Sequence, residues 1–181
     1  MSRVNTFVSI NAVNVTSDVQ QWKVFETFGN EIPDASIILS RTVLSSVTLT
    51  NGQAVIIQRG YTLGTEQNIF RGIIDSVQRK GAVIEVKAKN TLITLVKTDI
   101  NTSFDKDIDT EAGVGSAIAN TLITEYGGLS TNSGATVVST GAVVLLEKFV
   151  CRKTDIFDRL RTIADIYDYQ IYFNYDDQYV Y

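Results

Sequence analysis

The densest group of carboxylates in the sequence occupies alternate positions, in Asp105, Asp107, Asp109 and Glu111. Oxygen ligands at this spacing are typical of calcium loops, because a hard cation takes several carboxylates from one turn. A loop of the EF-hand type also needs glycine at its sixth position and an acidic residue at its twelfth. Here those positions hold Thr110 and Ser116. We therefore expect a solvated linker and no metal site.

Two glycines, Gly113 and Gly115, flank Val114 just before an expected helix. Glycines at a helix start occur in loops that bind phosphate groups, where backbone N–H groups face the ligand. The other parts of such motifs are missing, since no strand precedes the glycines and neither a third glycine nor the Walker lysine follows. We expect no nucleotide cofactor here.

A pair of carboxylates could carry acid and base chemistry of the glycosidase kind. The candidates are Asp165, Asp168, Asp176 and Asp177. The last two stand in an expected hairpin turn, where aspartate is favoured for backbone reasons alone. The first two lie on or beside the polar side of an expected helix. Nothing supplies the apolar pocket that would raise the pKa of one partner, so we expect no catalytic pair.

The sequence has no histidine, which removes the commonest general base and the commonest metal ligand. Its single cysteine, Cys151, cannot form an intrachain disulfide. The neighbouring Arg152 and Lys153 could lower the pKa of the thiol, but without a histidine partner a packed thiol is favoured. We expect no catalytic residue, no cofactor and no enzyme activity.

Aromatic side chains gather near the end of the sequence. They are Tyr167, Tyr169, Tyr172, Phe173, Tyr175, Tyr179 and Tyr181. Such a group can stack on bases or sugars, or form a core edge or a protein interface. With no basic groove around them, an interface or core is favoured over nucleic-acid stacking. A carbohydrate-binding β module that uses these tyrosines stays open as the alternative function.

The chain has 181 residues and a net charge of −4, with 44% hydrophobic and 20% charged residues. These values are typical of a globular protein of one large or two small domains. A protein that grips phosphate backbones normally carries a basic excess, so that class is disfavoured. The start resembles no secretory signal, and no apolar run approaches the roughly 20 residues of a membrane span. We expect synthesis in a cytoplasm and no membrane insertion.

Alternating apolar positions and turn signals divide residues 4–100 into short strands. Expected strands cover 7–15, 22–28, 35–39, 54–58, 69–74, 75–79 and 83–88. Trp22, Val24 and Phe28 share one face of the second of these. Asn51–Gly52 and Lys80–Gly81 are the clearest turns, because glycine tolerates positive φ. Even spacing of this kind favours a small barrel or sandwich.

The second half has helical periodicity in two places. One helix is expected over about 111–126, ended by Gly127 and Gly128. Another begins after Thr154 as its N-cap, with Asp155 at the positive end of its dipole. The polar residues 101–109 predict a linker, and residues 129–141 predict a loop. A strand is expected over 143–150, and a hairpin over 170–181 with its turn at 176–177. The prediction is a mainly β (α+β) protein with a barrel domain over 1–100 and a helix-strand-helix-hairpin domain over 101–181.

This order of features resembles the hub proteins of phage baseplates and related contractile injection machines. These include late-control D proteins and the N-terminal part of type VI secretion spike proteins. Three stretches carry the likeness: 51–60 with 69–75, which contains Phe70-Arg71-Gly72-Ile73; 114–128, which ends in Tyr-Gly; and 149–164 with 169–181. The family usually has glycine after the last helix, where this chain has Asp168, which tolerates a left-handed C-cap.

The resemblance implies a tail-tube-like β-barrel that contributes to a ring around a central channel, between the tail tube and the spike or tip. Family hubs usually contain a second barrel, so a compact hub, a fragment or one half of a split hub are all open. The implied partners are other copies of the chain (a trimer or a ring of six), the tail tube protein and other baseplate proteins. DNA would pass the mildly acidic channel without specific binding. The implied location is the virion, after assembly in the host cytoplasm.

Overall fold

The computed structural model describes residues 5–26, 31–61, 66–105, 115–131, 148–168, 170–171, 173–176 and 179–180. Contacts within the chain divide it into two compact units, Met1–Thr91 and Leu92–Tyr181. The division predicted from the sequence lies at residue 100. The structure groups the segment after Thr91 with the second unit, where the short helix α1 (Ile93–Val96) contacts the last helix.

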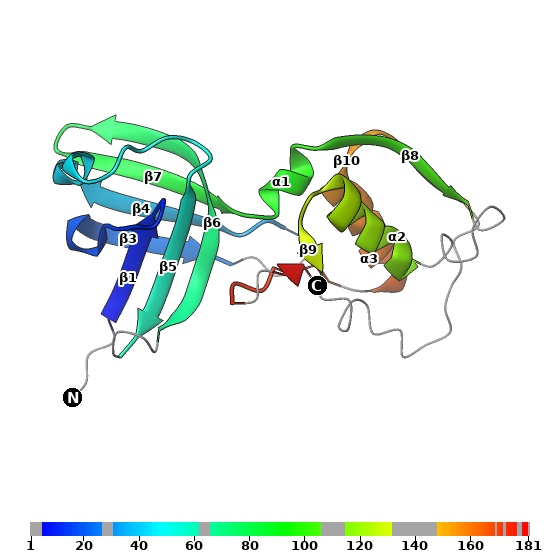
Figure 1. Ribbon diagram of the computed structural model, residues 1–181, viewed down its shortest axis with the longest axis horizontal. Helices are drawn as coiled ribbons and strands as arrows, with labels where there is room; N and C mark the ends of the chain where they lie inside the picture. The colour runs from blue at the N-terminus through cyan, green and yellow to red at the C-terminus, as the bar shows by residue number, and fades with distance from the viewer. Residues whose placement is uncertain are drawn as a thin grey trace. The chain divides into compact units, whose positions relative to one another are not determined.

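The first unit is built on one antiparallel sheet of seven strands (Figure 1). The strands are β1 (Asn5–Ile10), β2 (Val13–Asn14), β3 (Val19–Phe25), β4 (Asp34–Ser40), β5 (Ala54–Gly60), β6 (Gln67–Lys80) and β7 (Val83–Asn90). Two short 3₁₀ helices, Thr16–Asp18 and Arg41–Ser45, join them. The order across the sheet is β2-β1-β5-β6-β7-β4-β3.

The sheet curls into a half-barrel around its own core (Figure 1). Its inward side chains are apolar at alternate positions, as in Ile84, Val86 and Ala88 of β7, which are fully buried. Val43 and Val47, from the segment after β4, pack in the same core. Within the described residues no hydrogen-bonded pairing joins β2 to β3. The mainly β class is confirmed, and a closed tube-like barrel stays a prediction.

Two expected strands of the first unit differ from the structure. The single strand expected over 7–15 is interrupted at Asn11 and Ala12, whose φ angles are +50° and +63°, so the chain turns back as β2. The strands expected over 69–74 and 75–79 are one continuous strand, β6. A bulge between Ile74 and Ser76 absorbs the extra residue without ending the pairing with β7.

Trp22 and Val24 pack against the core from β3, as predicted, while Phe28 lies outside the described residues. The predicted turn at Lys80–Gly81 joins β6 to β7, with Gly81 at φ +60°. The alternation of apolar residues therefore identified the face of each strand that meets the core.

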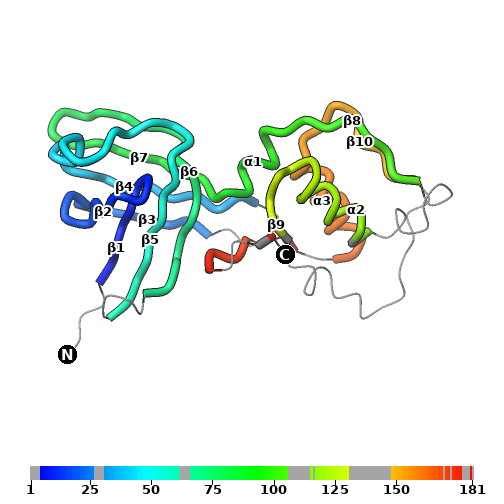
Figure 2. The backbone as a smooth tube through the Cα atoms, viewed as in Figure 1, coloured from blue at the N-terminus to red at the C-terminus, as the bar shows by residue number. Residues whose placement is uncertain are grey.

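The second unit combines two small two-stranded sheets with helices, and its backbone can be followed in Figure 2. Its elements are α1, β8 (Asp99–Asp105), α2 (Gly115–Thr121), a π-helical turn (Leu122–Tyr126), β9 (Ser130–Thr131), β10 (Lys148–Asp155), α3 (Ile156–Tyr167) and β11 (Tyr179–Val180). β8 pairs with β10 in antiparallel orientation, and β9 with β11 in parallel orientation. The apolar face of α3, formed by Ile156, Leu160 and Ile163, is buried.

Several predictions for the second half were wrong. Residues 101–105 are part of strand β8 and not a linker, because Ile100, Thr102 and Phe104 point to one face and meet residues of β10. The N-cap of α3 is Asp155 and not Thr154: its carboxylate accepts a hydrogen bond of 2.8 Å from the Asp158 N–H. By contrast, the expected C-terminal hairpin agrees with the antiparallel bridge that the structure has between Phe173 and Val180.

Candidate functional site

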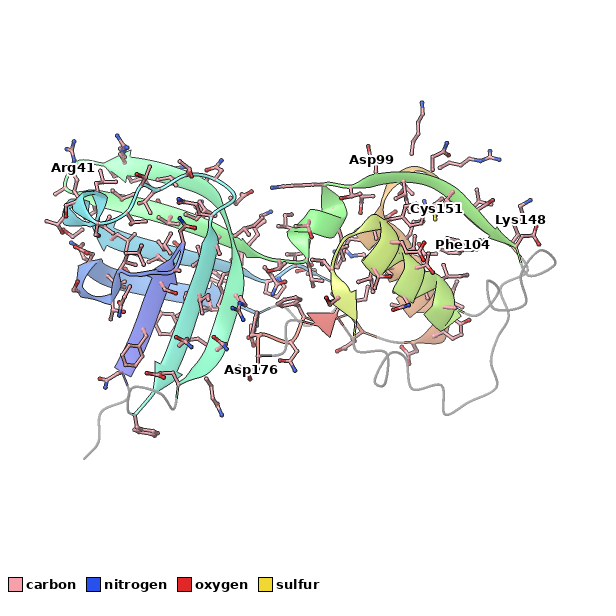
Figure 3. All side chains as sticks on the ribbon, viewed as in Figure 1. Arg41, Asp99, Phe104, Lys148, Cys151 and Asp176 are labelled. Atoms are coloured by element: carbon pink, nitrogen blue, oxygen red, sulfur yellow. The ribbon has the colours of Figure 1, made fainter. Side chains whose placement is uncertain are left out.

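Of the acidic group expected to form a solvated linker, only Asp105 lies in the described residues. It stands at the end of β8 opposite Lys148 of β10, with Asp105 Oδ2 3.8 Å from Lys148 Nζ (Figure 3). Asp107, Asp109 and Glu111 lie outside the described residues. Across the described part of the chain, no group of three or more His, Cys, Asp or Glu side chains could hold a metal ion.

Gly115 has a packing role that the sequence analysis missed. It begins α2, and a Cβ atom added to it would collide with the ring of Tyr167 in α3. The glycine therefore lets the Tyr167 ring lie against the start of the neighbouring helix. Gly113 and Val114 lie outside the described residues.

The four candidate acids do not form a catalytic pair in the described residues. Asp165 and Asp168 are exposed at the end of α3, and Asp168 closes the helix in the left-handed conformation, at φ 57° and ψ 44°. This confirms the C-cap expected at Asp168. Asp176 is exposed in a turn, where its N–H donates to Asn174 Oδ1 over 2.9 Å, and Asp177 lies outside the described residues.

Cys151 is a packed thiol, as predicted. It is fully buried on the face of β10 that meets the helices, in the row of Thr102 of β8. Phe104 lies opposite Phe149, the neighbouring residue of β10 on the same face as Cys151 (Figure 3). Burial raises the pKa of the Cys151 thiol, and the charge of Arg159 only partly opposes that shift. A thiol with a raised pKa is a poor nucleophile at neutral pH.

The described aromatic side chains near the C-terminus contribute to packing. Phe173 is buried, and its ring meets that of Tyr175 edge to face at a centroid distance of 6.3 Å. Tyr167 is half-buried against Gly115. The side chains of Tyr169, Tyr172, Tyr179 and Tyr181 lie outside the described residues. The interpretation of the C-terminal aromatic residues as a core edge therefore holds for Tyr167, Phe173 and Tyr175.

A cation–π contact on α3 was not predicted from the sequence. The Arg161 guanidinium carbon lies 4.8 Å from the centre of the Phe157 ring, which is itself buried. Such contacts contribute about 0.5–1 kcal/mol at exposed sites. The i, i+4 spacing of the two residues is the signal that could have revealed the contact.

Buried titratable groups, the usual mark of a catalytic site, are rare in the described residues. Asn90 is the single buried polar or charged side chain there, apart from the Cys151 thiol. Catalytic carboxylates and lysines usually owe their altered pKa to burial.

The described helices include none long and apolar enough to cross a membrane.

Two features of the surface suit protein contacts. β3 is an edge strand of seven residues, so one side of its backbone has no partner strand within the described residues. An unpaired edge is a ready template for a further strand. Large apolar side chains are also exposed on the described surface: Phe25, Tyr61, Val96, Tyr126 and Ile166.

Searches with protein-family models and among curated proteins give no match to this chain. Its fold nevertheless matches solved structures. The tail protein of Neisseria meningitidis MC58 superposes over 98% of this chain and 50% of its own, with a TM-score of 0.70 and 12% identity. The 43 kDa tail protein of prophage MuSo2 from Shewanella oneidensis matches over 90% and 49%, with a TM-score of 0.58 and 10% identity. The chain thus spans about half the length of two tail proteins and shares the fold of that half.

Proposed function

We propose that this chain is a structural component of a phage tail or tail-like particle, and within it a hub of the baseplate or tail tip. The observation that carries the proposal is the fold itself, which follows the Neisseria tail protein over 98% of the chain at a TM-score of 0.70. The second tail protein supports the same assignment over 90% of the chain. The proposed location is the virion, after assembly in the host cytoplasm.

In the proposed hub, copies of the chain form a ring around the central channel and connect the tail tube to the spike or tip. The open sheet of the first unit supports this arrangement, because the edge strand β3 can be covered by a neighbouring subunit. A trimer or a ring of six copies, with tube, spike and other baseplate proteins as partners, is the proposed assembly. DNA passes the channel without specific binding, in keeping with the net charge of −4.

The proposed role is not enzymatic. In the described residues, the candidate carboxylates Asp165, Asp168 and Asp176 are exposed, and the Cys151 thiol is buried. The carbohydrate-binding alternative gains no support from the described aromatics, because Phe173 is buried and offers no ring face to a sugar.

The proposal is tested on particles from cells that carry the gene. Purified tails are separated from soluble protein, and mass spectrometry measures the copies of this chain per tail; gold-labelled antibody then locates it. We expect a fixed copy number of three or six at the end of the tail that carries the baseplate or tip. Intact tails that assemble normally after deletion of the gene, and that lack the chain, would contradict the proposal.

A further inference from the structure

The face of the seven-stranded sheet that points away from the core carries a row of lysine and serine side chains. Residues paired across neighbouring strands place their side chains on the same face. Lys23 of β3 pairs with Ser36 of β4, which pairs with Lys87 of β7. Lys87 pairs in turn with Ser76 of β6. Val86, next to Lys87, is buried in the core, so the row lies on the opposite face. The row has two lysines and no carboxylate.

An exposed aromatic side chain lies beside this row. Phe25 follows Lys23 by two residues in β3, so the two side chains share a face about 7 Å apart. Half of the Phe25 side chain is exposed, at 52%. Carboxylates lie on this face too: Glu85 forms an ion pair with Lys80, and Asp34 stands between Phe25 of β3 and Lys89 of β7 in the strand register. We call Lys23, Phe25 and Lys87 the basic sheet face.

The second unit offers a surface of opposite charge. The first unit has nine Lys and Arg against seven Asp and Glu, whereas the second has seven against thirteen. At the end of α3, Asp165 and Asp168 are exposed and flank Ile166, which is 47% exposed. The last turn of α3 contains no Lys or Arg, so the negative end of the helix dipole adds to the charge of the two carboxylates. We call Asp165, Ile166 and Asp168 the acidic helix end.

We propose that the basic sheet face of one copy of the chain binds the acidic helix end of a second copy, so that chains join head to tail. Each surface has one exposed apolar residue beside two charges, and the charges of the two surfaces are opposite in sign. An apolar contact at the centre of a charged rim is the usual anatomy of a protein interface. Cations from the neighbour also relieve the unfavourable position of the Asp168 carboxylate at a helix C-terminus.

A head-to-tail contact uses different patches on the two partners, so repetition produces either a closed ring or an open filament. The inference thus rests on the proposed ring assembly and gives it a specific contact. A second copy is favoured over nucleic acid as the occupant, because two lysines on a chain of net charge −4 make a weak polyanion site.

The experiment measures the mass of the full chain by sedimentation and native mass spectrometry, using two charge-reversed variants. The sheet variant is Lys23→Glu with Lys87→Glu, and the helix variant is Asp165→Lys with Asp168→Lys. The control is Arg41→Glu with Arg79→Glu, which makes the same charge change at exposed positions outside the row. Circular dichroism and thermal melting verify that each variant is folded.

We expect the unmodified chain to assemble at about 50 mM salt and to dissociate at about 500 mM, where charges are screened over a few ångströms. Each reversed variant alone raises the concentration for half-assembly at least about tenfold, because like charges now meet. The control leaves that concentration unchanged. A mixture of the sheet and helix variants recovers even-numbered assemblies with equal numbers of each, since every contact again joins opposite charges.

The proposal is overturned if the unmodified chain stays monomeric at low salt, if the single variants assemble like the control, or if folded variants fail to recover on mixing. A parallel measurement tests whether the chain binds duplex DNA. If the sheet variant loses DNA binding while its assembly mass stays that of the unmodified chain, the occupant of the basic sheet face is a polyanion, and the proposal is overturned. None of these outcomes alters the copy number of the chain in purified tails, so the inference and the proposed function can fail separately.

Discussion

At the scale of single residues, Gly72 explains the Phe70-x-Gly72 pattern of strand β6. A Cβ atom added at Gly72 would collide with the Lys89 carbonyl oxygen of β7 and would lie 2.8 Å from Cζ of Phe70. The glycine therefore lets the Phe70 ring, which is fully buried, lie across its own strand. The pattern therefore allows the Phe70 ring to pack over Gly72 in the middle of the sheet.

We expect Gly72→Ala to lower the free energy of unfolding by about 1–3 kcal/mol, because the colliding backbone of β7 cannot move aside without breaking the ladder. Urea denaturation followed by Trp22 fluorescence measures the change. Gly81→Asn is the matched control: Gly81 has φ +60° with open space around it, and asparagine tolerates that conformation. An equal loss in both variants would contradict the steric explanation.

The buried Cys151 thiol gives a prediction about pH. Burial raises its pKa, so the folded state binds the proton more tightly than the unfolded chain does. That contribution to stability is complete below the ordinary thiol pKa of about 8.5 and is lost as the pH rises through the higher folded value. Denaturation at pH 7–10 should therefore show a steeper loss of stability in the native chain than in Cys151→Ala. Parallel curves would exclude a raised pKa.

At the scale of elements, the start of α3 depends on Asp155. Its carboxylate accepts the Asp158 N–H and lies at the positive end of the helix dipole. We expect Asp155→Ala to cost about 0.5–2 kcal/mol in urea denaturation, and Asp155→Asn much less, because asparagine also caps helices. Thr154→Ala is the discriminating comparison. If it proved more damaging than Asp155→Ala, the cap would belong to the residue that the sequence first suggested.

Elements with a strong local pattern could be predicted from the sequence. Alternation at Ile37, Leu39 and Ile84, Val86 identified β4 and β7, and the helical periodicity that begins after Thr154 identified α3. The left-handed C-cap at Asp168 followed from the tolerance of aspartate for positive φ. In each case the residues that determine the element lie within it.

Elements whose partners lie far along the chain could not be predicted in this way. Thr102 is polar at an inward-facing position and so hides the alternation of β8, whose hydrogen bonds come from β10. β9 has two residues and exists only through β11. The same holds for the cap of α3: β10 stays paired through Asp155, opposite Asp99, so the helix cannot begin before Ile156. Candidate chemistry was easier to assess, because histidine, a second cysteine and complete motifs are missing from the sequence itself.

At the scale of the whole molecule, each unit has its own hydrophobic core and its own chemical reporter. The core of the first unit includes no residue beyond Ala88, and the single tryptophan, Trp22, packs against it. The single cysteine, Cys151, is buried in the second unit. Stability can therefore be followed in both units of one unlabelled chain, by tryptophan fluorescence and by thiol reactivity.

We expect Gly72→Ala to shift the Trp22 transition to lower urea while the protection of Cys151 against a thiol reagent keeps its midpoint, because the lesion lies in one core only. Asp155→Ala should instead lower the urea midpoint of Cys151 protection and leave the midpoint of the Trp22 transition unchanged. Pulse labelling across a urea series, read against fluorescence of the same samples, measures both midpoints. If either substitution moved the two midpoints together, the units would unfold as one cooperative body, and separate cores would not mean separate stabilities.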